Sequence, residues 1–455
     1  MEEIRNDFDD VIELVKARRF VQLRESLIDV NPADIAALFD MLDDRETPLV
    51  YRILPKDLAS EVFAYMESET QELLIRSFSD YELKEVINDL FLDDTVDMIE
   101  EMPANVVARI LQAADPAVRR QINELLKYPE DSAGSIMTVE YVSLNKNLTV
   151  ADAFVKIRHE GIDKETVYTC YVTENRKLLG TVSVKQLLLA DDSQKVGDIM
   201  ETNLLYIDAY EDKEVVAKAF SKYDVLALPV VDKDIRIVGI VTVDDAIDVI
   251  EEEATEDIEK MAAIISDDRQ YLKTNVLSLW LKRFPWLLLL MVSATFTGSI
   301  IGSFESALTA FPALVAFIPM LMGTGGNAGG QSSATIIRGL GLGEIRMSDI
   351  LRVVWKEIRV SVLCGVALAI AGFLKILLVD NLLLNSGVSL AETAIVCITL
   401  AITVFFAKLI GSTLPILAKR IGLDPAVMAS PFITTIVDAI SLVVYFAVAS
   451  YVLNV

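Results

Sequence analysis

The distribution of apolar residues divides the chain into two unlike parts. Up to about residue 270, apolar positions are interspersed with charged ones, whereas the rest contains five long apolar segments, at about 284–303, 311–336, 360–379, 391–417 and 425–452. A helix needs about 20 apolar residues to cross about 30 Å of hydrocarbon. The pattern therefore predicts five membrane spans within residues 281–455, with soluble domains before them.

The last apolar segment carries a carboxylate within it. Asp424 and Pro425 are typical of an N-cap and a first helical turn. Asp438 then lies roughly 21 Å along the helix, at a depth inside the bilayer. Spacings of three and four residues place it on one polar helix face with Ser430, Thr434 and Ser441.

An aspartate inside a bilayer costs about 3 kcal/mol by insertion scales, so Asp438 is expected to face the bundle interior or a wet pathway. The alternative is a structural ion pair with Lys408 in the preceding span. Pro431 is expected to interrupt the last helix, because it lacks the backbone donor that would pair with the Val427 carbonyl.

Residues 1–126 show amphipathic helix patterns and little strand signal. Turn prolines precede three of these helices, at Pro32, Pro55 and Pro103, and the segment SDYELKEVI fills the remaining interval without a proline. A period near 24 residues predicts an all-α domain built as a short helical repeat.

Residues 127–250 contain a duplication. The segment that begins with GSIM at Gly134 matches GDIM at Gly197, and LLGTVSV at Leu178 matches IVGIVTV at Ile237. Each copy alternates β-rich runs with helical stretches, which predicts two βαβ-like domains, at 127–192 and 193–250. The following stretch, from Asp244 to Phe284, is expected to form one long helix. Residues 251–280 of this helix are expected to connect the soluble domains to the membrane spans.

Charge is distributed as unevenly as hydropathy. From Tyr271 onward there are 12 basic and 8 acidic residues, which leaves 29 basic and 59 acidic residues before it, so the two parts carry net charges of +4 and −30. Such an acidic half repels nucleic acid and attracts cations. The N-terminal segment shows no signal-peptide pattern, so the acidic half is expected to be cytosolic.

With that orientation, the basic residues gather on the cytoplasmic side, as the positive-inside rule requires, and five spans leave the C-terminus outside. The second span contains the string GTGGNAGGQSSATIIRG. Its glycines allow close helix approach or local unwinding, and Asn327 places an amide among them.

The duplicated domains resemble a tandem pair of CBS domains. In that family, a glycine followed by Thr or Ser and then Asp at a strand-to-helix turn binds the ribose and phosphates of adenine nucleotides. The second copy keeps this pattern as Gly239, Thr242 and Asp245, whereas the first has Gln186 in place of the aspartate. The resemblance implies ATP as a modulator at one site; the alternative is that the glycine only permits a tight turn.

The whole chain resembles the MgtE-type magnesium channels. The motifs that carry the resemblance are GTGGNAGGQSSATIIRG, LPILAKRIGLDPAVMASP and TTIVDAI, together with the CBS pair and the acidic N-domain. The resemblance implies a homodimer in the plasma (inner) membrane that conducts Mg2+ inward along the second and fifth spans. Pore ligands are expected at Asp438, Thr434, Asp424 and Asn327.

The same resemblance implies that cytosolic Mg2+ closes the pore by binding acidic residues of the soluble half. The expected regulatory ligands are Asp212, Glu214, Asp224, Asp245, Asp248, Glu253, Glu256 and Asp257, with Glu61 and Asp94 as candidates in the N-domain.

The chemistry of the ion is consistent with few ligands, because Mg2+ prefers oxygen and gives up its water reluctantly. No pattern indicates a catalytic nucleophile or triad, so the chain is not expected to be an enzyme. Two alternatives stay open. One is a proton-coupled divalent-cation carrier in which Asp438 titrates against Lys408, and the other is a membrane-anchored CBS nucleotide sensor.

Overall fold

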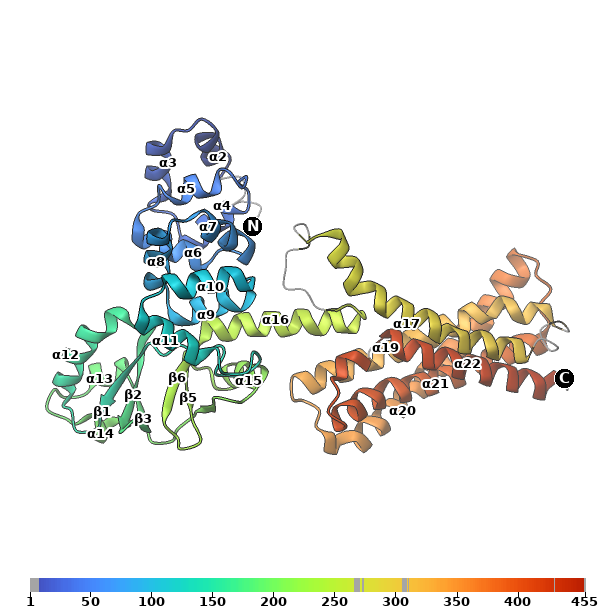
Figure 1. The fold of residues 1–455 in the computed structure, drawn as a ribbon. Helices are drawn as coiled ribbons and strands as arrows, with labels where there is room; N and C mark the ends of the chain where they lie inside the picture. Colours follow the sequence, from blue (N-terminus) through green and yellow to red (C-terminus); the bar gives the residue numbers. More distant parts are fainter. Residues whose placement is uncertain are drawn as a thin grey trace. The chain divides into compact units, whose positions relative to one another are not determined.

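The computed structural model describes residues 8–265, 271, 274–304, 309, 311–428 and 430–453. It comprises two compact units, Met1–Ile250 and Glu251–Val455. Each unit is described by itself below (Figure 1).

The first part of the N-terminal unit is entirely helical. Its helices are α2 (Asp9–Lys16), α3 (Phe20–Leu27), α4 (Pro32–Phe39), α5 (Thr47–Tyr51), α6 (Lys56–Ala64), α7 (Ser68–Ser77), α8 (Asp80–Asp89), α9 (Leu92–Glu101), α10 (Ala104–Ala113) and α11 (Pro116–Leu125).

The turn prolines lie where the sequence predicts helix starts. Pro32 is the first residue of α4, behind an Asn31 cap, while Pro55 and Pro103 are the N-cap residues of α6 and α10. The segment without a proline, α8, begins instead with a capping box between Ser79 and Glu82. Helices α4, α6, α8 and α10 therefore begin at residues 32, 56, 80 and 104, each 24 after the one before.

The two CBS domains contain sheets of the same design. The first comprises β1 (Tyr141–Asn145), α12 (Val150–Glu160), the 3-10 turn η1 (Gly161–Asp163), β2 (Thr166–Glu174), β3 (Lys177–Ser183) and α13 (Val184–Leu189). The second comprises α14 (Val196–Ile199), β4 (Ile207–Asp208), α15 (Lys213–Tyr223), β5 (Ala227–Val231) and β6 (Ile237–Thr242). In each sheet the first strand pairs parallel with the second, and the second pairs antiparallel with the third.

One hydrophobic core joins the helical domain to the second CBS domain. Val96 and Ile99 of α9 belong to the same buried cluster as Leu228 of β5 and Val241 of β6. The first CBS domain has a separate core around Val142, Val172 and Val182. Helix α9 is thus held against the second CBS domain, so the carboxylates of α9 lie where the helical domain meets that domain.

Helix α16 (Val243–Met261) follows directly from β6. The expectation of one helix extending to Phe284 is wrong, because α16 ends at Met261 and Ala263 adopts a left-handed backbone conformation with φ +56°. A new helix, α17 (Val276–Ser303), starts with its own cap, in which the Asn275 side chain accepts a hydrogen bond from the Leu277 N–H.

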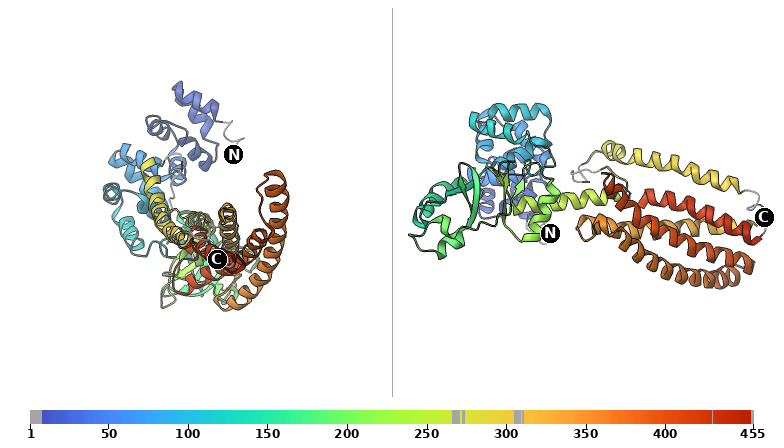
Figure 2. Two further views of the ribbon diagram at one scale, coloured as in Figure 1. Left: turned by 90° about the vertical axis from the view of Figure 1, so that its right-hand side faces the viewer. Right: turned by 90° about the horizontal axis from the view of Figure 1, so that it is seen from below.

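The remaining helices of the C-terminal unit run side by side in a bundle (Figure 2, right). They are η2 (Pro312–Phe317), α19 (Ile318–Gly341), η3 (Met347–Asp349), α20 (Ile350–Lys375), the π-helical η4 (Ile376–Leu383), α21 (Leu390–Arg420), η5 (Pro425–Met428) and α22 (Ser430–Leu453). Helix α19 packs against α21 and α22, and α20 packs against α21.

Four helical stretches of the described residues are long and apolar enough to cross a membrane: Val276–Ser303, Met347–Leu383, Leu390–Arg420 and Pro425–Leu453. Helix α19 is not among them, since glycines and polar residues interrupt its apolar sequence. It is nevertheless a continuous helix of 24 residues, so the glycine-rich string is not unwound.

The start of the last helix differs from the expectation. The Asp424 side chain accepts a hydrogen bond from the Ala426 N–H, as a cap should, but the turn it opens is a short 3-10 segment, and α22 itself begins at Ser430. Pro431 therefore lies in the first turn of α22, where its missing donor has no intrahelical role. It begins the helix and does not interrupt it.

Candidate ion pathway and regulatory sites

Glycines allow α19 to approach its neighbours closely. A Cβ atom added to Gly325 would lie 2.7 Å from Thr403 Cγ2, and one added to Gly326 would lie 2.9 Å from Thr434 Cγ2. At Gly411 of α21, an added Cβ would lie 2.2 Å from the Gly329 carbonyl oxygen. The string therefore permits close helix approach, one of the two roles that its sequence indicated.

The opposite side of α19 is polar and exposed in the single chain. Asn327, Gln331, Thr335 and Arg338 are all exposed, while Ala328, Gly329, Ser332 and Ser333 are buried. The exposed residues follow spacings of four, four and three, so they form one stripe along the helix. We call these four residues the α19 polar stripe. Polar side chains of this kind are not stable facing lipid, so the stripe must face water or protein.

Asp438 lies on α22, which packs against the glycine side of α19. Its Oδ1 atom is buried and has no hydrogen-bond partner among the described residues. Thr434, one turn earlier, is half-buried and contacts Gly326 through its side chain. The two side chains that the sequence placed on one helix face are thus both partly open, and the carboxylate retains an unsatisfied oxygen.

Lys408 is not seen paired with Asp438. Its buried ammonium donates to Ser332 Oγ at 3.4 Å, and the Ser332 hydroxyl in turn donates to Glu357 Oε2 at 2.7 Å. This chain links α21, α19 and α20. The described contacts of Lys408 therefore favour a role in helix association with Ser332 and Glu357, which the sequence analysis had not identified as its partners.

Asp424 lies at the turn before α22, and both of its oxygens have partners. Oδ1 accepts from the Ala426 N–H at 2.8 Å, and Oδ2 lies 2.7 Å from Lys260 Nζ. The same ammonium lies 2.7 Å from Glu256 Oε1. Lys260 thus joins an expected pore residue to an expected regulatory residue.

A second group of carboxylates lies where α9 meets the CBS domains. It consists of Asp93 and Asp94 on α9, Glu165 before β2, and Asp244 and Asp245 at the start of α16, and we call it the α9 junction. Burial and neighbouring carboxylates raise the pKa values of four of them, Asp93, Asp94, Glu165 and Asp245. Burial, with Asp97 and Asp244 nearby, raises the pKa of Asp94 to about 6.

The pKa values of Glu165, Asp245 and Asp93 are raised further. Burial and the charges of Asp244 and Asp94 raise the pKa of Glu165 to about 8. Burial raises that of Asp245 to about 7, against the lowering effect of its hydrogen bonds from Thr242. Burial and the charge of Asp245 raise the pKa of Asp93 well above its ordinary value. A cation at this junction would relieve the repulsion.

The structure brings Asp94 and Asp245 together, and it adds Asp93 and Glu165, which sequence reasoning missed. The Oδ1 atom of Asp93 and the Oε2 atom of Glu165 are buried with no hydrogen-bond partner among the described residues. Asp93 could have been suspected as the neighbour of Asp94, but Glu165 is brought there only by the fold. Across the described residues, no three acidic, His or Cys side chains are already close enough to form a metal cage.

The other expected regulatory residues are dispersed. Asp212 caps α15 by accepting from the Glu214 N–H, and Glu214 pairs with Lys218. Asp224 ends α15 in a left-handed conformation, and Glu61 is exposed on α6. Asp248, Glu253 and Asp257 lie along α16.

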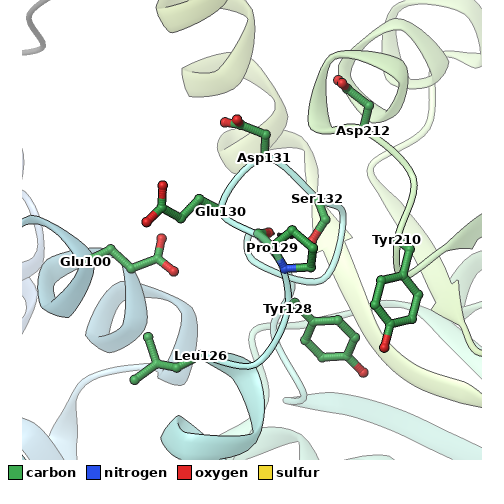
Figure 3. Close-up of a pocket in the computed structure, with 9 residues that line it drawn as sticks. All are labelled: Glu100, Leu126, Tyr128, Pro129, Glu130, Asp131, Ser132, Tyr210 and Asp212. Atoms are coloured by element: carbon green, nitrogen blue, oxygen red, sulfur yellow. Dashed lines mark hydrogen bonds between the residues drawn. The ribbon is translucent and has the colours of Figure 1, made fainter.

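A cavity of about 670 Å3 opens beside α9, on the side of Asp212 (Figure 3). Glu100, Glu130, Asp131 and Asp212 line it together with two tyrosines, Tyr128 and Tyr210. Figure 3 shows the carboxylates of Glu100 and Glu130 turned toward each other. Burial and the charges of Asp97 and Glu130 raise the pKa of Glu100 to about 7. The acidic character of the α9 junction thus extends along the helix.

The expected nucleotide residues also have structural roles. The Thr242 hydroxyl and N–H both donate to Asp245 Oδ2, which caps the first turn of α16. In the first copy, Ser183 and Gln186 form the equivalent capping box before α13. Gly239 lies inside β6, not in the turn, and an added Cβ there would lie 2.7 Å from the Thr138 carbonyl oxygen.

A helical soluble domain, a tandem CBS pair and a bundle of apolar helices that carries Asp438 define the class of this chain. It is a multi-pass membrane transport protein with a soluble regulatory part, and not an enzyme.

The family follows from the comparisons. The model of the divalent cation transporter MgtE matches residues 318–448, that of the MgtE intracellular N domain matches 30–131, and the CBS domain model matches 133–193 and 196–252. The chain belongs to the MgtE family.

Relatives agree over almost the whole length. The chain is 38% identical to magnesium transporter MgtE of Thermus thermophilus, covering 95% of both chains, and 33% identical to that of Bacillus subtilis, covering 97% of this chain and 96% of the relative. A crystal structure of the cytosolic domain of the Mg2+ channel MgtE in complex with ATP matches 52% of this chain and 99% of its own, with 35% identity and a TM-score of 0.50.

Proposed function

We propose that the chain forms a Mg2+ channel that carries the ion inward along a pathway lined by α19 and α22. The observation that carries this proposal is the α19 polar stripe, which is exposed in the single chain although α19 belongs to an apolar bundle. Asp438 and Thr434 on α22 supply carboxylate and hydroxyl oxygens, and Asn327 supplies an amide oxygen. Mg2+ prefers such ligands and retains part of its water shell.

A homodimer completes this pathway. If two chains meet along α19 and α22, the polar stripes face each other and not lipid, which removes the cost of exposing Asn327 to hydrocarbon. Two Asp438 carboxylates then lie near one axis. In this arrangement α19 is a fifth span, which places the C-terminus outside an inner membrane and the acidic half in the cytoplasm.

Cytosolic Mg2+ closes this channel. The α9 junction is the main site, since it collects ionisable oxygens, two of them buried and unpartnered, in a part of the chain with strong net negative charge. Asp212, Glu214, Asp224, Asp248, Glu253, Glu256, Asp257 and Glu61 provide further ligands on α6, α15 and α16. A divalent ion that binds only the compact arrangement shifts the equilibrium toward it.

ATP acts as a modulator at the second CBS domain, where Gly239, Thr242 and Asp245 keep the nucleotide pattern. The support is the similar cytosolic domain that was crystallised with ATP. Since Asp245 also belongs to the α9 junction, a nucleotide there would alter the same carboxylates that bind Mg2+.

The test of the pathway is Mg2+ flux into liposomes that contain the purified full-length chain. Asp438→Asn keeps the shape of the side chain but removes its charge, so flux should fall at least about tenfold while the elution profile of the protein stays unchanged. Asp380→Asn is a matched control, because Asp380 is a carboxylate of η4 that pairs with Lys375. Wild-type flux in Asp438→Asn would exclude Asp438 as a pore ligand.

Two other functions fit the structure less well. A proton-coupled carrier in which Lys408 exchanges protons with Asp438 is disfavoured, because the hydrogen bond of Lys408 goes to Ser332. A membrane-anchored nucleotide sensor would not need a polar stripe on α19. Flux that is independent of a pH gradient separates the channel from the carrier.

A further inference from the structure

Lys260 is the penultimate residue of α16 and touches the turn that precedes α22. Its Nζ atom is 2.7 Å from Asp424 Oδ2 and 2.7 Å from Glu256 Oε1. The side chains of Lys260 and Asp424 are 27% and 34% exposed, so the contact is shielded from much of the solvent. Next to it, Met261 packs against Ile337 of α19 and Ala426. The end of α16 is therefore attached to this turn by one ionic and one apolar contact.

The ammonium stays charged in this position. Burial alone would lower the pKa of Lys260, but its hydrogen bonds with Asp424 and Glu256 outweigh that effect and raise the pKa above the ordinary value. A positive charge is therefore fixed beside Asp424 across the physiological pH range.

Both oxygens of Asp424 are then engaged. The Ala426 N–H occupies Oδ1 at 2.8 Å, and Lys260 occupies Oδ2. A hydrated divalent cation that approached Asp424 would meet a carboxylate whose charge Lys260 already balances. The Lys260 ammonium thus supplies the positive charge that a bound cation would otherwise supply beside Asp424.

We propose that Lys260 is a tethered cation that competes with the transported ion for Asp424 and so helps to hold the channel closed. This rests on the proposed function, in which Asp424 belongs to the ion pathway. Permeation requires the ammonium to leave Asp424.

Glu256 makes this exchange reversible. Glu256 lies one turn before Lys260 on the same helix. Their i, i+4 ion pair can therefore persist when α16 moves as a whole. When the ammonium leaves Asp424, Glu256 remains as its partner, so the lysine is not left without a counter-charge. The departure of the ammonium therefore changes only Asp424, whose carboxylate becomes available to a cation.

The experiment is patch recording of the full-length protein with Mg2+ raised on the cytosolic side. Lys260→Met keeps the length of the side chain and removes the charge. Because a partly exposed ion pair contributes up to about 1 kcal/mol, closure of this variant should need roughly threefold to fivefold more Mg2+ than closure of the wild type. Lys260→Arg should close at the wild-type concentration.

Two further variants separate competition at Asp424 from a general weakening of α16. Lys156→Met removes another i, i+4 pair, with Glu160 on α12, and should leave closure unchanged. If Lys260 acts through Asp424, adding Lys260→Met to Asp424→Asn should produce no further shift. An additive shift, or closure of Lys260→Met at the wild-type concentration, would overturn the proposal.

Failure of the proposed function would give a different result from failure of the tethered-cation proposal. In that case Asp438→Asn would conduct like the wild type, whereas the tethered-cation proposal fails alone if Asp438→Asn abolishes flux and Lys260→Met still closes normally.

Discussion

Gly329 and Gly411 set the distance between α19 and α21. An added Cβ on Gly411 would lie 2.2 Å from the backbone oxygen of Gly329, and a backbone atom cannot move aside as a flexible side chain can. The same helix carries Asn327 on its exposed side, so a shift of α19 would also displace the polar stripe. At the scale of single residues, packing and pathway are therefore coupled.

Gly411→Ala should accordingly reduce both stability and flux. Overpacking of this kind costs about 1–3 kcal/mol, so the thermal midpoint of the detergent-solubilised protein should fall and Mg2+ flux should drop severalfold. Gly298→Ala on α17 is the matched control, since an added Cβ there has nothing within 4 Å. Equal behaviour of the two variants would show that the close contact does not constrain α19.

Helix α9 determines where the acidic residues meet. Its apolar side contributes Val96 and Ile99 to the shared core, while Asp93 and Asp94 face the carboxylates of the second CBS domain. Folding therefore buries these carboxylates and brings like charges together, and the pKa values of Asp93 and Asp94 rise as a result. We therefore expect the junction to hold protons when no metal ion is bound.

The raised pKa values predict a proton release when Mg2+ binds. The values of about 6, 7 and 8 for Asp94, Asp245 and Glu165 mean that the folded protein holds protons at pH 7 that the ionised, Mg2+-binding form must release. In weakly buffered solution, adding Mg2+ at pH 7 should acidify the sample, and the release should be smaller at pH 9. Glu165→Gln should reduce it, whereas Glu174→Gln, at an exposed pair with Lys146, should not.

The same values set the sign of the stability change. A carboxyl group whose folded pKa is raised stabilises the fold below its ordinary pKa of about 4, and this contribution is lost as the pH rises through the folded pKa. Without Mg2+, the contribution of these three groups should therefore decline between about pH 4 and pH 8, and thermal unfolding should show a growing benefit of Mg2+ over that range. A benefit that shrinks with rising pH would contradict this assignment.

At the scale of the whole molecule, the two parts carry opposite net charge, −30 before Tyr271 and +4 after it. An acidic part of this size repels itself, and monovalent ions screen that repulsion only partly at short distance. We therefore expect divalent ions to have a large effect on how compact this acidic part is.

Neutralising the sensor should leave a channel that conducts but does not close. Asp245→Asn combined with Asp248→Asn removes two carboxyl groups at the start of α16, so patch recordings should show open channels at Mg2+ levels that close the wild type. Asp191→Asn with Asp192→Asn removes two carboxyl groups from an exposed turn of the first CBS domain and should close normally. Normal closure of the Asp245 and Asp248 double variant would place the sensor elsewhere.

Much of the architecture could be predicted from the sequence because it depends on local patterns. Turn prolines marked the starts of α4, α6 and α10, and the duplication marked two sheets of the same design. The helix boundaries at Met261 and Ser430 were missed, since they depend on the left-handed residue at Ala263 and on the 3-10 turn before α22, which hydropathy does not report.

By itself the sequence determined the division into a soluble and an apolar part, the strong negative charge of the first part and the presence of a carboxylate, Asp438, within an apolar segment, because hydropathy, charge and helical spacing are properties of neighbouring residues. Only the tertiary structure decided that Glu165 joins Asp93 and Asp94, that Lys408 contacts Ser332, and that Lys260 occupies Asp424. These contacts join residues from 71 to 164 positions apart in the chain, and side-chain partners at such separations are set by how the helices pack.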